Sequence, residues 1–201
     1  MRLIGITGGV GAGKTEILSY IRKHYKCRIY LADEVARDIQ MPGQACYERI
    51  VALLGKDILA ADGRIDRGKM AAKIFLETEL LNRVNAIVHP AVREYLERAV
   101  ESARKEKETE LFFIEAALLI ENGYCDFVDE MWYIYAAPEV RRERLQKSRG
   151  YSREKIAQIM ASQLSEDAFY KNSDFVIDNS GSLEQTYSRI RERLEAYTWQ
   201  E

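Results

Sequence analysis

The fold of this chain is decided by one stretch near its start, Gly8-Gly9-Val10-Gly11-Ala12-Gly13-Lys14-Thr15. The stretch matches the pattern G-x-x-x-x-G-K-[ST] at every fixed position. Its glycines allow a tight turn and let the backbone approach an anion without an intervening Cβ atom. The apolar run at residues 2–7 predicts a buried strand before the stretch, and periodic apolar residues predict a helix after it. We therefore interpret the stretch as a phosphate-binding loop, rather than as a Gly-rich turn with a surface lysine.

Each residue type in this loop suits a nucleoside triphosphate. Successive backbone N–H groups and the N-terminus of the following helix point at the bound anion. Lys14 supplies a point charge for the β- and γ-phosphates, and the Thr15 hydroxyl is a ligand for Mg²⁺. Glu16 is expected to contribute its backbone rather than its side chain. The residues expected to contact the nucleotide here are Gly8, Gly9, Gly11, Ala12, Gly13, Lys14, Thr15 and Glu16.

The rest of the chain predicts an α/β fold. Short apolar runs suggest further strands at residues 28–32, 111–114, 131–136 and 175–177. Nearly continuous apolar strands separated by helical patterns are typical of a parallel sheet that is covered on both faces. We therefore expect a P-loop NTPase fold, with a five-stranded parallel sheet flanked by helices.

Two helical segments lie outside this simple alternation. The long block between the second and third strands is expected to be helical, and we interpret residues 62–108 as an insertion that binds the acceptor. Within it, the step His89-Pro90 is expected to break the helix, because the residue before a proline avoids the α region. Residues 138–165 are helical and rich in arginine, and Ser182 with Gln185 predicts a capping box at the last helix.

Length, charge and cysteine content narrow the class of protein. The chain has 201 residues and a net charge of −2, which favours one main domain and gives no global basic surface for nucleic acid. Its three cysteines form no CxxC pair, so neither a disulfide framework nor a zinc site is indicated. No signal peptide or membrane-spanning run is apparent. We expect a cytoplasmic protein that acts on a small molecule, as a monomer or weak homo-oligomer, without nucleic-acid or membrane partners.

A carboxylate at the end of the second strand has two interpretations. In open α/β sheets ligands bind outside the carboxyl ends of the strands, so Asp33 can accept a proton from a substrate hydroxyl or help to hold Mg²⁺. Alternatively, Asp33 is the N-cap of the helix that begins near Glu34. Position alone favours neither interpretation.

The arginines of segment 138–165 also have two interpretations. Most of them fit a solvated helix face with glutamates nearby. Arg141 and Arg144 are three residues apart and share a face, and a lid could bring such residues onto the transferring phosphate. The charge of an arginine stabilises phosphoryl transfer, and a closed lid keeps water out.

Beyond the loop, ordered segments of this chain resemble the dephospho-CoA kinase family from about residue 3 to about residue 195. Ala32–Arg37 resembles the family's D-A-D-x-I-A-R, and Asp62–Arg67 resembles its D-G-x-L-D-R. The other matching segments are Thr7–Lys14, Gly55–Ile58, Leu81–Asn82 with His89–Pro90, Leu118–Glu121, Arg144–Leu145 with Arg149, Gln163, and Asp178–Gly181. Ordered motifs at matching spacing are much more specific than a phosphate-binding loop alone.

The resemblance implies a reaction and a role for several residues. The ribose 3′-hydroxyl of dephospho-CoA attacks the γ-phosphate of ATP, which gives coenzyme A and ADP. Asp33 matches the position that the family uses as the base, and Lys14 with Mg²⁺ neutralises phosphate charge. Arg144 is then expected in the lid over the nucleotide, and Asn179 near its adenine end. The acceptor-binding residues expected from the resemblance are Asp33, Arg37, Arg64, His89, Arg93 and Leu118; His89 is equally compatible with a structural role at the helix break.

The chain also departs from the family pattern. Leu31 replaces the first Asp of D-A-D, Ala117 replaces a proline, and Ile120 replaces a phenylalanine, whereas Thr15 in place of Ser keeps the hydroxyl. Two alternatives therefore stay open. One is another small-molecule kinase, such as a nucleoside monophosphate kinase, and the other is a nucleotide-dependent switch that has lost kinase activity.

Overall fold

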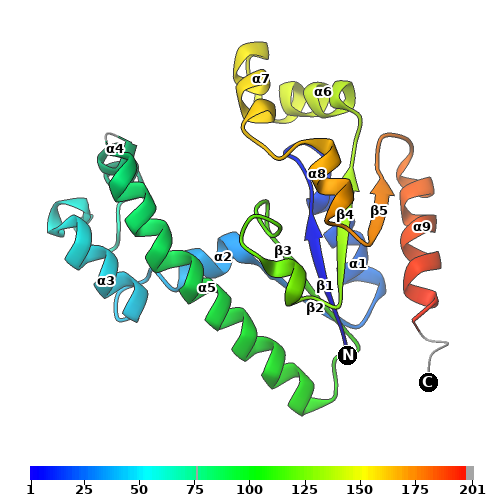
Figure 1. The fold of residues 1–201 in the computed structure, drawn as a ribbon, viewed down its shortest axis with the longest axis horizontal. Coiled ribbons are helices and arrows are strands. Elements are labelled where there is room, and N and C mark those ends of the chain that lie inside the picture. The colour runs from blue at the N-terminus through cyan, green and yellow to red at the C-terminus, as the bar shows by residue number, and fades with distance from the viewer. Residues whose placement is uncertain (76, 198–201) are drawn as a thin grey trace. The chain divides into compact units, whose positions relative to one another are not determined.

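The computed structural model describes residues 1–75 and 77–197. Within it the chain divides into two compact units. Unit 1 comprises Met1–Ile29 together with the chain from Lys107 onward, and unit 2 comprises Tyr30–Glu106. Unit 1 carries most of the sheet and unit 2 is mainly helical (Figure 1).

The sheet has five strands, as the sequence predicts. They are β1 (Arg2–Thr7), β2 (Cys27–Leu31), β3 (Leu111–Glu115), β4 (Glu130–Tyr135) and β5 (Phe175–Asp178), in the spatial order β2-β3-β1-β4-β5. The ladders of β1 with β3, of β1 with β4, and of β4 with β5 are parallel. The central strand β1 is buried along nearly its whole length, which explains its continuous apolar run.

Helices cover both faces of the sheet in unit 1. On one face, Trp132 of β4 packs edge-on against the rings of Phe113 and Phe175, 5.9 and 5.2 Å away between centroids. On the other face, Tyr133 stacks at 4.7 Å on Phe169 of α8 (Glu166–Lys171). Because neighbouring residues of a strand point to opposite faces, two adjacent aromatic residues of β4 serve two cores.

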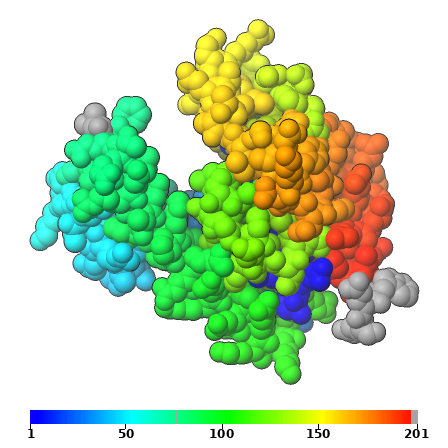
Figure 2. All heavy atoms as spheres, in the orientation of Figure 1, coloured from blue at the N-terminus to red at the C-terminus, as the bar shows by residue number. Residues whose placement is uncertain are grey.

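The remaining helices of unit 1 are α1 (Lys14–His24), α6 (Pro138–Arg149), α7 (Arg153–Ala161) and α9 (Leu183–Glu195), and a short 3₁₀ turn, η2, spans Tyr124–Asp126. The capping box predicted for the last helix is confirmed, since the Ser182 side chain accepts from Gln185 N and the Gln185 side chain accepts from Ser182 N. The atoms of α7, yellow in Figure 2, project from the rest of unit 1. Residues 138–165 are thus helical, as expected.

Unit 2 is built of α2 (Ala32–Asp38), α3 (Ala45–Leu54), the 3₁₀ turn η1 (Lys56–Ile58), α4 (Arg67–Phe75) and α5 (Thr78–Glu106). The helix break predicted at His89-Pro90 is wrong, because α5 is a single helix of 29 residues with Pro90 inside it. The proline removes one backbone donor from the helix. The buried residues Ile87 and Val92 on either side of it keep one apolar face in register. Tertiary burial therefore overrides the local preference of the residue before proline.

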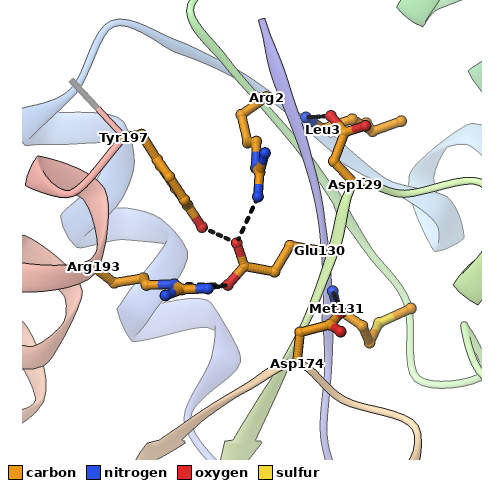
Figure 3. Close-up of polar contacts among 8 residues, drawn as sticks. All are labelled: Arg2, Leu3, Asp129, Glu130, Met131, Asp174, Arg193 and Tyr197. Atoms are coloured by element: carbon orange, nitrogen blue, oxygen red, sulfur yellow. Dashed lines mark hydrogen bonds and ion pairs between the residues drawn. The ribbon is translucent and has the colours of Figure 1, made fainter. Parts of the chain in front are cut away.

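A buried carboxylate fixes α9 to the sheet (Figure 3). Glu130 at the start of β4 is only 2% exposed and accepts from Arg193 Nε at 2.7 Å and from the Tyr197 hydroxyl. The Arg2 guanidinium lies 3.7 Å from the same carboxylate. A buried charge is tolerated only when it is paired in this way. These contacts bring the start of β1, the start of β4 and the end of α9 together.

Substitution of Glu130 by Ala should lower the free energy of unfolding by about 2 kcal/mol. This loss of unfolding free energy is smaller than is usual when one partner of a buried ion pair is removed, because Arg193 is partly exposed. Urea denaturation measures it, with Glu192→Ala on the exposed face of α9 as the control. Equal, small losses in both variants would contradict the anchoring role of Glu130.

Candidate active site

The phosphate-binding loop ends at the uncapped N-terminus of α1. Gly13 is the N-cap of this helix and has a φ of 94°, a left-handed backbone conformation that residues with a Cβ atom rarely adopt. It offers no side chain to the first-turn donors, an arrangement typical of a helix N-terminus that binds an anion. The Thr15 side chain in this first turn is exposed.

Side chains from outside the loop hold two of its carbonyl groups. Arg141 of α6 donates from Nε to Val10 O at 2.9 Å. Asn179, directly after β5, donates to Ala12 O at 2.8 Å, and Arg144 donates to the same oxygen at 3.2 Å. In a planar trans peptide the C=O of one residue and the N–H of the next point in opposite directions. The N–H groups of Gly11 and Gly13 are thereby directed away from these donors, toward the interior of the loop.

The Lys14 ammonium group lies across the loop. It donates to Gly8 O at 2.7 Å and lies 3.6 Å from the Glu115 carboxylate at the end of β3. Both charged side chains are largely buried. These contacts hold the lysine side chain across the backbone of the loop.

The Asn179 side chain is buried beside the loop. Its side chain is 1% exposed, and its Oδ1 accepts from the Thr186 hydroxyl at 3.0 Å. Its backbone O accepts from Arg144 at 2.8 Å. The amide therefore supports the loop, and the place near the adenine end of the nucleotide that the resemblance implies for Asn179 stays a prediction. Arg144, expected over the nucleotide, also contacts the loop and Asn179.

The sequence places Arg141 only among the arginines that a lid could bring onto phosphate, and Gln163 only among the segments that resemble the family. In the structure both side chains contact the loop. Arg141 is 8% exposed, and burial lowers the pKa of its guanidinium. Gln163 accepts from Val10 N at 3.1 Å. Arg141 and Arg144, three residues apart, share the helix face that meets the loop, whereas Arg142 between them pairs with exposed Glu139.

The Glu16 side chain contacts α9, and the backbone role toward the nucleotide that the sequence indicates stays a prediction. Its carboxylate accepts from the Tyr187 hydroxyl at 2.7 Å, which raises the pKa of Tyr187 to about 12. The Tyr187 ring also stacks on Tyr20 at 3.9 Å. Glu16 thus helps α1 to pack against α9.

Unit 2 contains a pocket of about 500 Å³ between α2 and α4, within the usual size range of ligand sites. Its lining residues are Asp33, Ala36, Arg37, Gln40, Arg67, Met70, Ala71 and Ile74. Asp33 is the second residue of α2, and the N-cap is Leu31, so the alternative that Asp33 caps the helix is excluded. The exposed carboxylate faces a pocket that two arginines also line.

The pocket includes only part of the predicted acceptor set. Asp33 and Arg37 line it, whereas Arg64, His89, Arg93 and Leu118 do not. Arg64 is exposed and lies 3.6 Å from Asp62. Arg93 donates to Glu97 within α5. Arg67 was missed although it ends the segment Asp62–Arg67 that carried the resemblance; its place at the start of α4 decides that it reaches the pocket.

Comparison with known proteins identifies the family. A family model described as dephospho-CoA kinase matches residues 2–185. A dephospho-CoA kinase of Corynebacterium diphtheriae is 34% identical over 200 residues, covering 100% of this chain and 96% of the relative. One of Geobacter sulfurreducens is 36% identical over 192 residues, covering 96% of each chain. This chain belongs to the dephospho-CoA kinase family. Membership makes it a P-loop kinase of coenzyme A biosynthesis, with ATP as co-substrate.

Solved structures agree on the fold. A protein of Thermus thermophilus superimposes with a TM-score of 0.80 at 28% identity, covering 97% of each chain. The dephospho-CoA kinase of Campylobacter jejuni gives a TM-score of 0.74 at 22% identity, and a shikimate kinase of Acinetobacter baumannii gives 0.52 at 13%. The expected P-loop kinase fold is confirmed. Among the helices of the described residues, none has the length and apolar character needed to cross a bilayer.

Replacement of Asn179 by Asp should weaken ATP binding about tenfold or more. The carboxylate keeps the acceptor for Thr186 but has no proton to donate to Ala12 O, so that carbonyl keeps only the longer bond from Arg144 and faces a negative charge. Titration calorimetry with Mg-ATP measures the dissociation constant.

Asn172→Ala is the matched control, because the Asn172 amide also donates to a backbone carbonyl, that of Ala168, but at the end of α8. An unchanged affinity in Asn179→Asp would show that the loop does not need this donor.

Proposed function

We propose that this chain transfers the γ-phosphoryl group of ATP to the ribose 3′-hydroxyl of dephospho-CoA, giving coenzyme A and ADP. The observation that carries this proposal is the pocket of unit 2, where the Asp33 carboxylate and the side chains of Arg37 and Arg67 line one cavity. A base and cations together suit an acceptor that offers a hydroxyl and carries phosphates. Family membership supports the same reaction.

The nucleotide is proposed to bind at the loop of unit 1. The N–H groups of Gly11, Gly13, Lys14 and Thr15 and the Lys14 ammonium stabilise the negative charge of the phosphates, as in other loops of this pattern. Positioning and electrostatic stabilisation account for most of the catalysis in phosphoryl transfer. The role of Arg144 is to keep Ala12 O turned away from the phosphates, since its guanidinium donates to that oxygen.

Asp33 is proposed as the base that accepts the proton of the attacking hydroxyl. As the acceptor oxygen bonds to the γ-phosphorus, its proton passes to the carboxylate, and the bond to the ADP oxygen breaks. The Asp33 side chain is exposed and has no capping role in α2, which leaves the carboxylate to the pocket.

Mg²⁺ is proposed to bind beside the loop. The chemistry of the nearby donors fits a hard cation, because Thr15 offers a hydroxyl oxygen in the first turn of α1 and Glu115 a carboxylate at the end of β3. Thr15 is the direct ligand in this proposal. When bound, the ion neutralises charge on the phosphate oxygens.

The acceptor is proposed to bind along α2 and α4. Arg37 and Arg67 provide positive charge for the diphosphate of dephospho-CoA, and Met70 and Ile74 provide apolar surface. Contacts from Arg64, His89, Arg93 and Leu118 stay predictions, as do an acceptor-binding insertion at 62–108 and a lid at 138–165. We further propose that the protein acts in the cytoplasm as a monomer or weak homo-oligomer, on a small molecule and not on nucleic acid or membranes.

Asp33→Asn should reduce kcat for dephospho-CoA phosphorylation by about 10² to 10⁴-fold, the usual contribution of a positioned base. ADP formation with Mg-ATP, with and without dephospho-CoA, measures it. Asp38→Asn at the end of the same helix is the control, because Asp38 does not line the pocket.

Three results would contradict the proposal in different ways. Full activity of Asp33→Asn would show that Asp33 is not the base. Turnover only with another acceptor, such as a nucleoside monophosphate, would show that dephospho-CoA is not the substrate. ATP binding without any acceptor-dependent turnover would favour a nucleotide-dependent switch.

Arg67→Met should raise the KM for dephospho-CoA about tenfold and leave the KM for ATP unchanged. Loss of a charge-assisted bond to phosphate has this magnitude. Steady-state kinetics with each substrate varied in turn provide the measurement, and Arg49→Met, at an exposed position of α3, is the control. A raised KM for ATP instead would place Arg67 in the nucleotide site.

A further inference from the structure

One side-chain pair contacts the phosphate-binding loop at a single residue, Val10. Arg141 Nε donates to Val10 O at 2.9 Å, and Gln163 Oε1 accepts from Val10 N at 3.1 Å. The two side chains also bond to each other, from Arg141 Nη2 to Gln163 Oε1 at 2.6 Å. Gln163 therefore accepts two hydrogen bonds on one oxygen, and Val10 is held on both of its backbone polar groups.

These bonds set the orientation of two consecutive peptide planes. The bond to Gln163 turns Val10 N–H outward, so Gly9 C=O in the same peptide points the other way, where it accepts from Ala12 N at 3.1 Å. The bond from Arg141 turns Val10 C=O outward and Gly11 N–H the other way. A rotation of the plane that Arg141 holds would present Val10 C=O to a bound phosphate. A rotation of the plane that Gln163 holds would break the bond from Ala12 N to Gly9 O, which closes the turn of the loop.

The pair is itself held by the sheet. Arg141 lies on α6, which begins three residues after β4 ends, and its guanidinium packs so closely on Gly9 that an added Cβ atom there would collide with it. Gln163 lies between α7 and α8, two residues before Ser165, the N-cap of α8. The stacking of Phe169 on Tyr133 fixes α8 to β4. Both members of the pair therefore connect the loop to β4.

Burial of Arg141 also needs a reason. Placing a guanidinium in a site that is 8% exposed is costly unless the group is hydrogen-bonded. Its neighbours Arg142 and Glu143 on the same helix are exposed and pair with Glu139 and Lys147. A solvated helix face accounts for those residues but not for Arg141, which is directed at the loop.

We infer that Arg141 and Gln163 are positioning residues of the nucleotide site, which hold the peptide groups on either side of Val10 so that Gly11 N–H faces the phosphates of ATP. They act through the backbone of the loop. Their contribution concerns nucleotide binding rather than the acceptor. The inference rests on the proposed function only in taking ATP as the ligand.

The test uses the full chain and four variants. Arg141→Met and Gln163→Met remove the donor and the acceptor, Gln163→Glu keeps an acceptor at the same place, and Arg142→Met is the matched control. Isothermal titration calorimetry measures the dissociation constants of Mg-ATP and Mg-ADP. An assay of ADP release measures KM and kcat, and differential scanning calorimetry measures the melting temperature without nucleotide.

Arg141→Met and Gln163→Met should each weaken ATP binding about tenfold, and the double variant should add little to either, because both bonds serve one unit. The KM for ATP should rise with little change in kcat or in the KM for dephospho-CoA. Gln163→Glu should return the affinity to within about threefold of the parent. Arg142→Met should behave as the parent.

A purely structural role would give a different pattern. It would lower the melting temperature of Gln163→Met while ATP affinity stays unchanged, and that result would overturn the inference. Equal weakening by Gln163→Glu and Gln163→Met would overturn it as well, since the acceptor would then be irrelevant. Failure of the parent to phosphorylate dephospho-CoA would contradict the proposed function alone, because the ATP-binding comparison still decides the role of the pair.

Discussion

The shape of the phosphate-binding loop, the proposed nucleotide site, depends on the outward orientation of two of its carbonyl groups, those of Val10 and Ala12. Each carbonyl is held by donors from outside the loop, Arg141 in the first case and Asn179 with Arg144 in the second. Planarity of the peptide bond converts this into inward N–H groups at Gly11 and Gly13. Because these N–H groups are oriented before the nucleotide binds, they need little reorganisation when negative charge develops on the phosphates during transfer.

The topology of the sheet supplies these donors. The loop follows β1, α6 follows β4, and Asn179 follows β5, and these three strands are parallel neighbours. Their carboxyl ends therefore meet at one edge, where ligands of open α/β sheets bind. At the opposite end of β4, Glu130 binds the end of α9, so the strand that carries α6 is anchored at both ends. Packing far from the phosphates thus contributes to the shape of their site.

Sequence patterns predicted the features that depend on local composition. Buried apolar runs gave the five strands, the glycine spacing gave the loop, and Ser182 with Gln185 gave the capping box. Features set by tertiary packing were not predictable in this way. The helix break expected at Pro90 fails because a long buried face holds α5 together, and the place of Arg67 in a pocket depends on how α2 and α4 both pack on α5. Likewise, no local pattern shows that Asn179 and Arg141 point at a loop more than a hundred residues away.

The central claim is that the loop has its phosphate-binding shape before the nucleotide binds. Crystal structures of the protein without nucleotide and with ADP would test it most directly. We predict that the backbone of residues 8–15 differs by less than about 1 Å between them, and that Val10 O and Ala12 O keep their side-chain donors in both. A collapsed loop in the free protein, or carbonyls that turn only when ADP binds, would contradict the account.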